Sequence, residues 1–262
     1  MTILEKIIHD KKKEVALKKQ VVPVSQLETS ALFERPVHSL SQRIKTTPGG
    51  IIAEHKRRSP SKSVINQQLN VYEVASGYEK AGVSGMSVLT DGKYFGGSLE
   101  DLLLARASCK LPLLRKEFII DEYQLIEAKA YGADAVLLIA AVLNSQQLKA
   151  LSECAFALGL EVLLEVHNRK ELDKALSLNV PILGINNRDL KTFKVSLETS
   201  RNLAALIPDT FIKVSESGIH SAEAIQQLKS YGFSGFLIGE NFMKTEDPGK
   251  EAHTFIQQIT RA

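Results

Sequence analysis

Polar and charged side chains follow short apolar runs at regular points along this sequence. Their types suit acid–base chemistry, because an ammonium group can deliver a proton and a carboxylate can accept one. A single charged residue is also what a strand ending at solvent produces, but five runs ending in Lys, Glu or Asn favour a shared site. The residues are Glu54, Lys56, Thr90, Asp91, Lys116, Glu165, Asn186, Arg188, Glu216, Ser217 and Gly239.

The stretch IIAEHKRRSPSKS, residues 51–63, indicates how two of these side chains come together. Successive side chains of a strand point to opposite faces, so Glu54 and Lys56 share the face of Ile52. We expect both to emerge at the carboxyl end of the strand, where they form one wall of the site. His55 falls on the other face and is expected to point outward, toward the helices.

Two lysines and several glutamates around one pocket predict a site for proton transfer. Lys56 and Lys116 are the candidate acids and anion binders, and Glu165 is the candidate base. Asn186 is a neutral donor that could orient the substrate. A lysine beside another cation has a lowered pKa and can release a proton near neutral pH. A Schiff-base aldolase, in which one lysine is the nucleophile, is the main chemical alternative.

Two loops and an apolar wall predict the kind of ligand. SESGI and IGE place Ser217, Gly218 and Gly239 where backbone N–H groups can approach a phosphate, as the last two loops of barrels commonly do. Arg188 could add a charge-assisted contact. Three apolar residues near the charged ring could hold an aromatic group, so we expect a substrate with one aromatic and one phosphorylated end. They are Phe95, Phe118 and Leu190.

These side chains require a scaffold that brings strand ends together. Beyond residue 45, eight short apolar runs rich in Val, Ile and Leu alternate with eight segments of helical periodicity. This pattern predicts an α/β fold, a (β/α)8 TIM barrel over residues 46–262, preceded by a helical extension over residues 1–45. An open doubly wound sheet is the alternative, but the chain lacks a GxGxxG turn.

Capping residues predict where the helices begin and end. Short polar side chains that can accept the first free N–H groups stand at five predicted helix starts, and glycines stand at four predicted ends. The predicted N-caps are Ser98, Asp121, Asn144, Asn168 and Ser196. The predicted terminating glycines are Gly82, Gly132, Gly159 and Gly232.

Composition excludes several classes of protein. The 262 residues carry a formal charge of +3, too weak a bias for nucleic-acid binding, and no segment has the ~20 apolar residues that a membrane span needs. Cys109 and Cys154 have no zinc-site or disulfide spacing, and His167 and His220 stand isolated, so we expect no metal. We expect a cytoplasmic monomer whose partner is a small phosphorylated molecule.

Seven motifs, in chain order, resemble the indole-3-glycerol phosphate synthase family of tryptophan biosynthesis. They are AEHKRRSPSKS, LTDGKYFGGS, LLRKEF, LLEVH, GINNRDL, SESGI and IGENFM. The resemblance spans the predicted barrel from its first strand to its eighth and includes the N-terminal extension. It implies ring closure, decarboxylation and dehydration of 1-(2-carboxyphenylamino)-1-deoxyribulose 5-phosphate, with no cofactor.

The resemblance also implies a role for each site residue. Lys116 would be the general acid of ring closure, Glu165 the acid or base of dehydration, and Lys56 the partner of the substrate carboxylate. The rest of the implied catalytic set is Glu54, Asn186, Glu216 and Ser217. The implied substrate-binding residues are Ser59, Phe95, Phe118, Arg188, Leu190, Gly218 and Gly239, with Ser217 also at the phosphate.

Two other functions remain as alternatives. A phosphoribosylanthranilate isomerase-like barrel would need a Cys/Asp acid–base pair, yet neither Cys109 nor Cys154 follows a predicted strand. A non-catalytic barrel that binds a phosphorylated ligand would keep the phosphate loops and lack the acid–base groups. The N-terminal extension could cap the barrel mouth or could only cover apolar surface.

Overall fold

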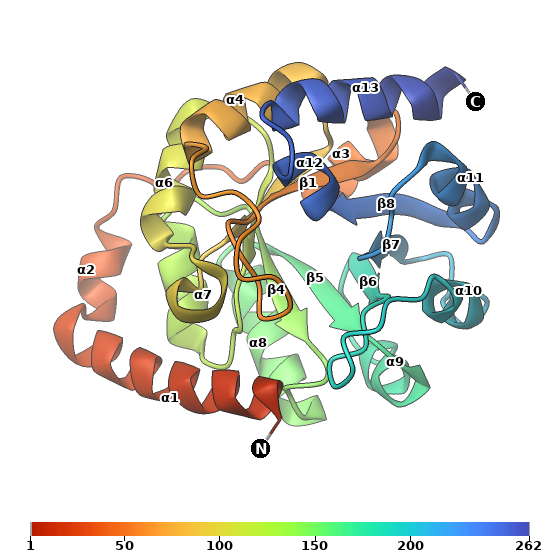
Figure 1. Cartoon of the computed structure of the whole chain (residues 1–262). Coiled ribbons are helices and arrows are strands. Elements are labelled where there is room, and N and C mark those ends of the chain that lie inside the picture. Colours follow the sequence, from red (N-terminus) through yellow and green to blue (C-terminus); the bar gives the residue numbers. More distant parts are fainter. Residues whose placement is uncertain (1, 262) are drawn as a thin grey trace.

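Eight parallel strands close into a barrel in which each strand pairs with the next and β8 returns to β1 (Figure 1). The structure is a computed structural model and describes residues 2–261. The predicted (β/α)8 barrel is confirmed. The strands are β1 (Ile51–His55), β2 (Gly85–Leu89), β3 (Leu113–Lys116), β4 (Ala135–Ile139), β5 (Glu161–Val166), β6 (Ile182–Asn186), β7 (Ile212–Glu216) and β8 (Phe233–Ile238).

Helices surround the strands, and all eight segments with helical periodicity form a helix. The outer helices are α4 (Val71–Ala81), α6 (Leu99–Ser108), α7 (Glu122–Ala130), α8 (Ser145–Ala157), α9 (Arg169–Ala175), α10 (Glu198–Ala204), α11 (Ala222–Ser230) and α13 (Pro248–Arg261). Two further helices, α5 (Gly92–Phe95) and α12 (Glu240–Met243), are too short for periodicity to predict. Among residues 2–261, no helix combines the length and the hydropathy that crossing a membrane requires.

The capping signals were accurate at all but one position. The confirmed N-caps, each accepting a backbone N–H in the first turn, are Ser98, Asp121, Asn144 and Asn168. Ser196 is wrong, because α10 begins at Glu198 and its N-cap is Leu197, which makes no side-chain capping bond. The terminating glycines have left-handed φ values between 74° and 86°: Gly82, Gly132, Gly159 and Gly232.

Alternation along the strands separates two apolar cores. Ile52 and Leu163 belong to the cluster inside the barrel, whereas Ile51 and Ala53 pack in the layer between strands and helices. His55 shares the outer face, as predicted, and is buried there at 1% exposure. Burial and the neighbouring Arg57 lower the pKa of His55 to about 4, so His55 is neutral at pH 7.

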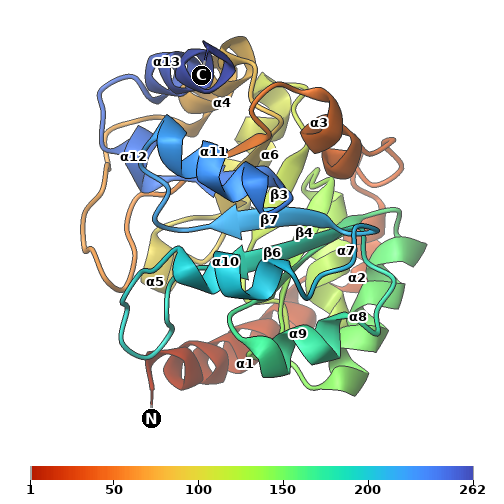
Figure 2. The same cartoon turned by 90° about the vertical axis from the view of Figure 1, so that its right-hand side faces the viewer.

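Three helices precede β1 and contact opposite ends of the barrel. They are α1 (Ile3–Val21), α2 (Val24–Glu28) and α3 (Leu40–Thr46). Leu40 and Ile44 of α3 belong to the interior cluster, so α3 closes the amino end of the barrel. Figure 2 shows α3 at the right, opposite the loops that follow the strands at the left.

A buried lysine attaches α1 to the other end of the barrel. The Nζ atom of Lys11, whose side chain is 2% exposed, lies 3.0 Å from Asp91 and 3.1 Å from Glu117. Burial lowers the pKa of Lys11, but these carboxylates outweigh burial and raise it above its usual value. Asp91 therefore faces α1, and Thr90 donates to Glu117, so neither belongs to the ring of site residues predicted from the sequence.

Replacing Lys11 by alanine should strongly destabilise the protein. The change leaves Asp91 buried without its cation and Glu117 with only Arg115, 3.8 Å away, and leaving a buried charge unpaired typically costs about 3–5 kcal/mol. Urea unfolding followed by circular dichroism measures this loss as a lower midpoint. Lys13→Ala is the matched control, because Lys13 is exposed on the same helix. Equal midpoints for the two variants would show that the buried ion pairs do not anchor α1.

Candidate active site

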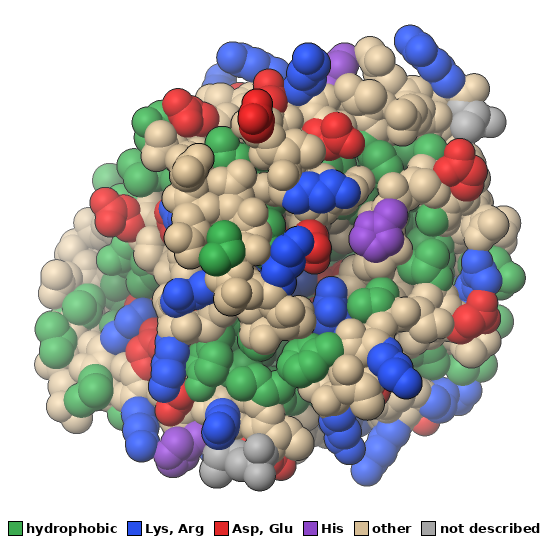
Figure 3. All heavy atoms as spheres, in the orientation of Figure 1, with side chains coloured by type: hydrophobic (Ala, Val, Ile, Leu, Met, Phe, Trp, Pro, Cys, Tyr) green, Lys and Arg blue, Asp and Glu red, His purple; other side chains and the backbone are tan. Residues whose placement is uncertain are grey.

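A pocket of about 340 Å³ opens at the carboxyl ends of the strands. Figure 3 shows Lys and Arg side chains and a group of hydrophobic side chains around a hollow near the middle of this face. The site residues predicted from the sequence line the pocket, except Thr90 and Asp91, which face away from it, and Glu216, which lies beneath it. The lining members are Glu54, Lys56, Ser59, Phe95, Lys116, Phe118, Glu165, Asn186, Arg188, Leu190, Ser217, Gly218 and Gly239.

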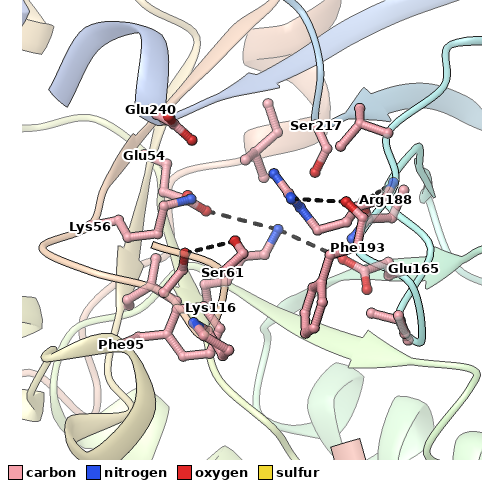
Figure 4. Close-up of a pocket in the computed structure, with 18 of the residues that line it drawn as sticks. Glu54, Lys56, Ser61, Phe95, Lys116, Glu165, Arg188, Phe193, Ser217 and Glu240 are labelled. Atoms are coloured by element: carbon pink, nitrogen blue, oxygen red, sulfur yellow. Dashed lines mark hydrogen bonds and ion pairs between the residues drawn. The ribbon is translucent and has the colours of Figure 1, made fainter. Parts of the chain in front are cut away.

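Lys116 stands at the centre of three carboxylates (Figure 4). Its Nζ atom lies 2.5 Å from Glu216 Oε2, 3.7 Å from Glu165 Oε2 and 3.9 Å from Glu54 Oε2. Burial lowers the pKa of Lys116, but the carboxylates outweigh burial and raise it above its usual value. The predicted lowering of a lysine pKa by a second cation is therefore wrong for Lys116. An amine that keeps its proton is also a poor Schiff-base nucleophile.

Glu54 connects the two lysines of the site. Its Oε1 atom lies 2.5 Å from Nζ of Lys56, while Oε2 faces Lys116. Burial raises the pKa of Glu54, but Lys56 and Lys116 outweigh burial and keep it lowered. A Cβ atom at Gly239 would lie 2.6 Å from Glu54 Oε1, so this position leaves the room that the carboxylate needs.

Glu216 is the carboxylate that holds a proton most readily. It is 1% exposed at the end of β7, and a Cβ atom at Gly184 would overlap its Oε1 atom. Burial raises the pKa of Glu216 and the charge of Glu165 adds to the effect, so that it reaches about 7 despite Lys116. Near neutral pH the cluster can therefore gain or lose a proton at Glu216.

Glu165 has a basic neighbour that the sequence did not reveal. His167 Nε2 lies 3.3 Å from Glu165 Oε1, so the prediction that His167 stands isolated is wrong. Burial raises the pKa of Glu165, but His167 and Lys116 outweigh burial and lower it to about 2. Glu165 is thus an ionised carboxylate across the physiological range.

The turn after β7 has a backbone conformation that side chains rarely adopt. Ser217 has a φ of 68° and Gly218 a φ of 77°, both in the left-handed region. Asn187 supports this turn, because its Nδ2 atom donates to the Ser217 carbonyl at 3.0 Å and to Ser215 Oγ at 2.9 Å. Asn187 was missed, although the doubled asparagine of NNRDL places it on the face opposite Asn186.

Asn186 and Arg188 come from one loop at the mouth of the pocket. The Oδ1 atom of Asn186 accepts the backbone N–H of Arg188 at 3.0 Å, which leaves the Asn186 amide donors for a ligand. The Arg188 guanidinium donates to the Phe193 carbonyl within the same loop. The loop thereby presents a neutral donor and a cation, and Figure 4 shows the cation, Arg188, on the same side of the pocket as Ser217.

An apolar wall faces the charged centre. The rings of Phe95 and Phe118 lie 6.0 Å apart between centroids, and Leu190 also lines the pocket. Helix α1 adds further apolar side chains, which resolves its two alternative roles in favour of a contribution to the pocket. Those side chains are Ile3, Leu4 and Ile7.

The first loop, which joins β1 to α4, crosses the mouth of the pocket and is held by an ion pair on each side. Arg57 pairs with Asp101 at 2.6 Å, and Lys62 pairs with Glu240 of α12 at 2.9 Å. Ser59 lies within this loop, where its backbone N–H donates to the Lys62 carbonyl. Across residues 2–261, no group of three or more His, Cys, Asp or Glu residues is arranged to hold a metal ion.

A closed (β/α)8 barrel with acid–base groups at its strand ends is the architecture of a barrel enzyme. The family model of indole-3-glycerol phosphate synthase matches residues 4–255. The chain is 47% identical over 257 residues to indole-3-glycerol phosphate synthase from Bacteroides thetaiotaomicron, with 98% of each chain covered. It is 45% identical over 253 residues to that of Dechloromonas aromatica, covering 95% of this chain and 97% of the relative. The chain belongs to the indole-3-glycerol phosphate synthase family.

The barrel itself is also similar to solved structures of low sequence identity. One is 3-hexulose-6-phosphate synthase from Salmonella typhimurium, with a TM-score of 0.64 and 12% identity. The similarity covers 81% of this chain and 99% of that one. At this identity the likeness supports the fold alone.

Glu216→Gln should alter how stability depends on pH. The folded pKa of Glu216 is raised from 4.5 to about 7, so its stabilising contribution is complete below 4.5 and is lost as pH rises through 7. From pH 4.5 to 7, the free energy of unfolding of the variant should therefore increase by about 1–3 kcal/mol relative to that of the unsubstituted chain. Urea unfolding at several pH values measures this difference, and a constant difference would contradict the raised pKa.

Proposed function

We propose that the chain converts 1-(2-carboxyphenylamino)-1-deoxyribulose 5-phosphate into indole-3-glycerol phosphate, carbon dioxide and water. Membership of the synthase family supports this reaction. The observation that carries the assignment to particular side chains is the position of Lys116. Its ammonium group lies among three carboxylates, between an apolar wall and a loop suited to phosphate.

Substrate binding uses the two sides of the pocket. The aromatic ring lies against Phe95, Phe118 and Leu190, as their apolar surface supports. The phosphate lies against the backbone N–H groups of the SESGI and IGE turns, at Ser217, Gly218 and Gly239, with Arg188 supplying a positive charge. Ser59 faces the ligand from the first loop.

Ring closure joins the ring carbon that bears the carboxylate to the ketose carbonyl carbon. As that bond forms, the carbonyl oxygen gains negative charge and takes a proton from Lys116, which leaves a hydroxyl group. Lys56 binds the substrate carboxylate, and Glu54 orients Lys56 through their 2.5 Å contact. Asn186 donates a neutral hydrogen bond that helps to hold the reacting groups in line.

Decarboxylation and dehydration then complete the indole. The carbon–carboxylate bond breaks, carbon dioxide leaves, and its electron pair restores the aromatic ring. The new hydroxyl departs as water after gaining a proton, and Glu165 removes the proton from the neighbouring carbon so that the double bond forms. Glu216 and Lys116 exchange protons with this centre, which suits the raised pKa of Glu216, about 7.

The other features of the chain fit a single catalytic unit. We propose that residues 1–45 form an extension of the barrel, which spans residues 46–262, and that α1 completes the apolar wall of the substrate site. Two free cysteines support a cytoplasmic location, and we propose that the chain acts as a monomer. An isomerase that needs a catalytic cysteine is disfavoured, because Cys109 and Cys154 do not line the pocket.

Lys116→Ala should abolish turnover without abolishing binding. Removing the acid of ring closure should lower kcat by about 10²–10⁴-fold. Because the chain has no tryptophan, indole fluorescence reports product on a low background. Binding of a substrate analogue whose ketone is reduced to an alcohol, measured by calorimetry, should remain within a few-fold because the phosphate loop and aromatic wall are intact.

Lys149→Ala is the matched control, because Lys149 is 68% exposed on α8. This variant should turn over substrate normally. Full activity of Lys116→Ala would exclude Lys116 as the acid. A folded, analogue-binding wild-type chain without product would overturn the synthase assignment and favour a non-catalytic ligand-binding barrel.

A further inference from the structure

His167 lies directly after β5, between a carboxylate of the pocket and a carboxylate of the outer helix layer. Its Nε2 atom is 3.3 Å from Glu165 Oε1, and its Nδ1 atom is 3.0 Å from Glu171 Oε2 of α9. The side chain is 8% exposed and does not line the pocket. His167 therefore acts on the site only through Glu165.

Glu171 is fixed independently of the imidazole ring. Its Oε2 atom also accepts the backbone N–H of His167 at 2.8 Å, and its Oε1 atom accepts from Asn168 Nδ2 at 2.6 Å. These bonds hold the carboxylate at the first turn of α9, where a negative charge is favourable. Glu171 therefore holds the ring of His167 from the helix layer outside the barrel.

Both ring nitrogens of His167 face carboxylates, which only a doubly protonated imidazole can satisfy by donation. Nε2 is buried and makes no well-formed hydrogen bond with any described residue, so its 3.3 Å approach to Glu165 Oε1 is an ion-pair contact. Burial lowers the pKa of His167, but Glu165 and Glu171 outweigh burial and raise it to about 10. His167 is consequently an imidazolium at neutral pH.

The two oxygens of Glu165 face different cations. Oε1 faces His167, whereas Oε2 lies 3.7 Å from Lys116 Nζ. The other charged groups that act on Glu165 are carboxylates, Glu216 on β7 and Glu54 on β1. The charge of Glu54 opposes the ionised form of Glu165, whereas Glu216 favours it, and His167 offsets the effect of Glu54 from outside the pocket.

We propose that His167 is a positioning residue for Glu165, which holds that carboxylate ionised and keeps one of its oxygens directed at Lys116. This role rests on the proposed function of Glu165 in proton transfer. The residue pair Glu171 and His167 forms a chain of charges that leads from the helix layer to the pocket. Lys116 is the second cation on Glu165, so loss of His167 weakens the ionised form without eliminating it.

His167→Gln tests the proposal, since glutamine keeps a donor near Glu165 but carries no charge. The pH at which kcat falls on the acidic side of its profile should rise by about one unit. Below that pH, kcat should be about tenfold lower than in the unsubstituted chain. KM should stay within twofold, because His167 does not line the pocket. His253→Gln, an exposed histidine on α13, should leave the profile unchanged.

A second readout reports the charge of the ring without requiring turnover. The chain has six histidines, so ¹⁵N imidazole spectra can be assigned by the signal that His167→Gln removes. His167 should remain doubly protonated at pH 8, and Glu171→Gln should make it lose a proton at lower pH. Glu171→Gln should also shift the kcat limb in the same direction by a smaller amount, which provides a test if His167→Gln does not fold.

The outcomes separate this proposal from the proposed function. A neutral ring at pH 7, or an unshifted limb in a folded His167→Gln, would overturn the positioning role while turnover stands. A charged ring in a wild-type chain without turnover would overturn the proposed function and leave only the ion pairing.

Discussion

The contact of Lys116 with its three carboxylates is the interaction on which the site depends. Lys116 comes from β3, and its partners come from β1, β5 and β7, so one ammonium group joins four strands around the barrel. Removing charges from water is costly, and any one of these groups alone would destabilise the fold. Lys116, together with Lys56 at Glu54 and His167 at Glu165, offsets these negative charges and allows a polar centre directly above an apolar barrel interior.

The pocket around this centre is built from segments that are distant in sequence. The first loop, the β6–α10 loop, the turn after β7 and helix α1 each supply one side of it. Lys11 and Asp91 join α1 to the start of α5, the helix that carries Phe95. The electrostatic anchor of α1 and the aromatic wall of the pocket are therefore parts of one assembly.

Strand-end side chains were predictable because a period of two and a closed parallel sheet leave little freedom. Glu54, Glu165 and Asn186 had to meet at one end once the strands were identified. Side-chain pairing across the barrel was not predictable, because it depends on which neighbour faces which atom. For this reason the raised pKa of Lys116 and the partners of His167 required the structure.

Helix α3 links the beginning of the chain to its end. Leu40 lies against Gly85 of β2, whereas Ile44 lies against Gly235 of β8, the last strand to be made. On the ribosome, Ile44 therefore cannot reach its final burial until almost the whole polypeptide has emerged. This apolar side chain lacks its last neighbour for most of synthesis, so the nascent chain has a prolonged interval in which chaperones can bind it.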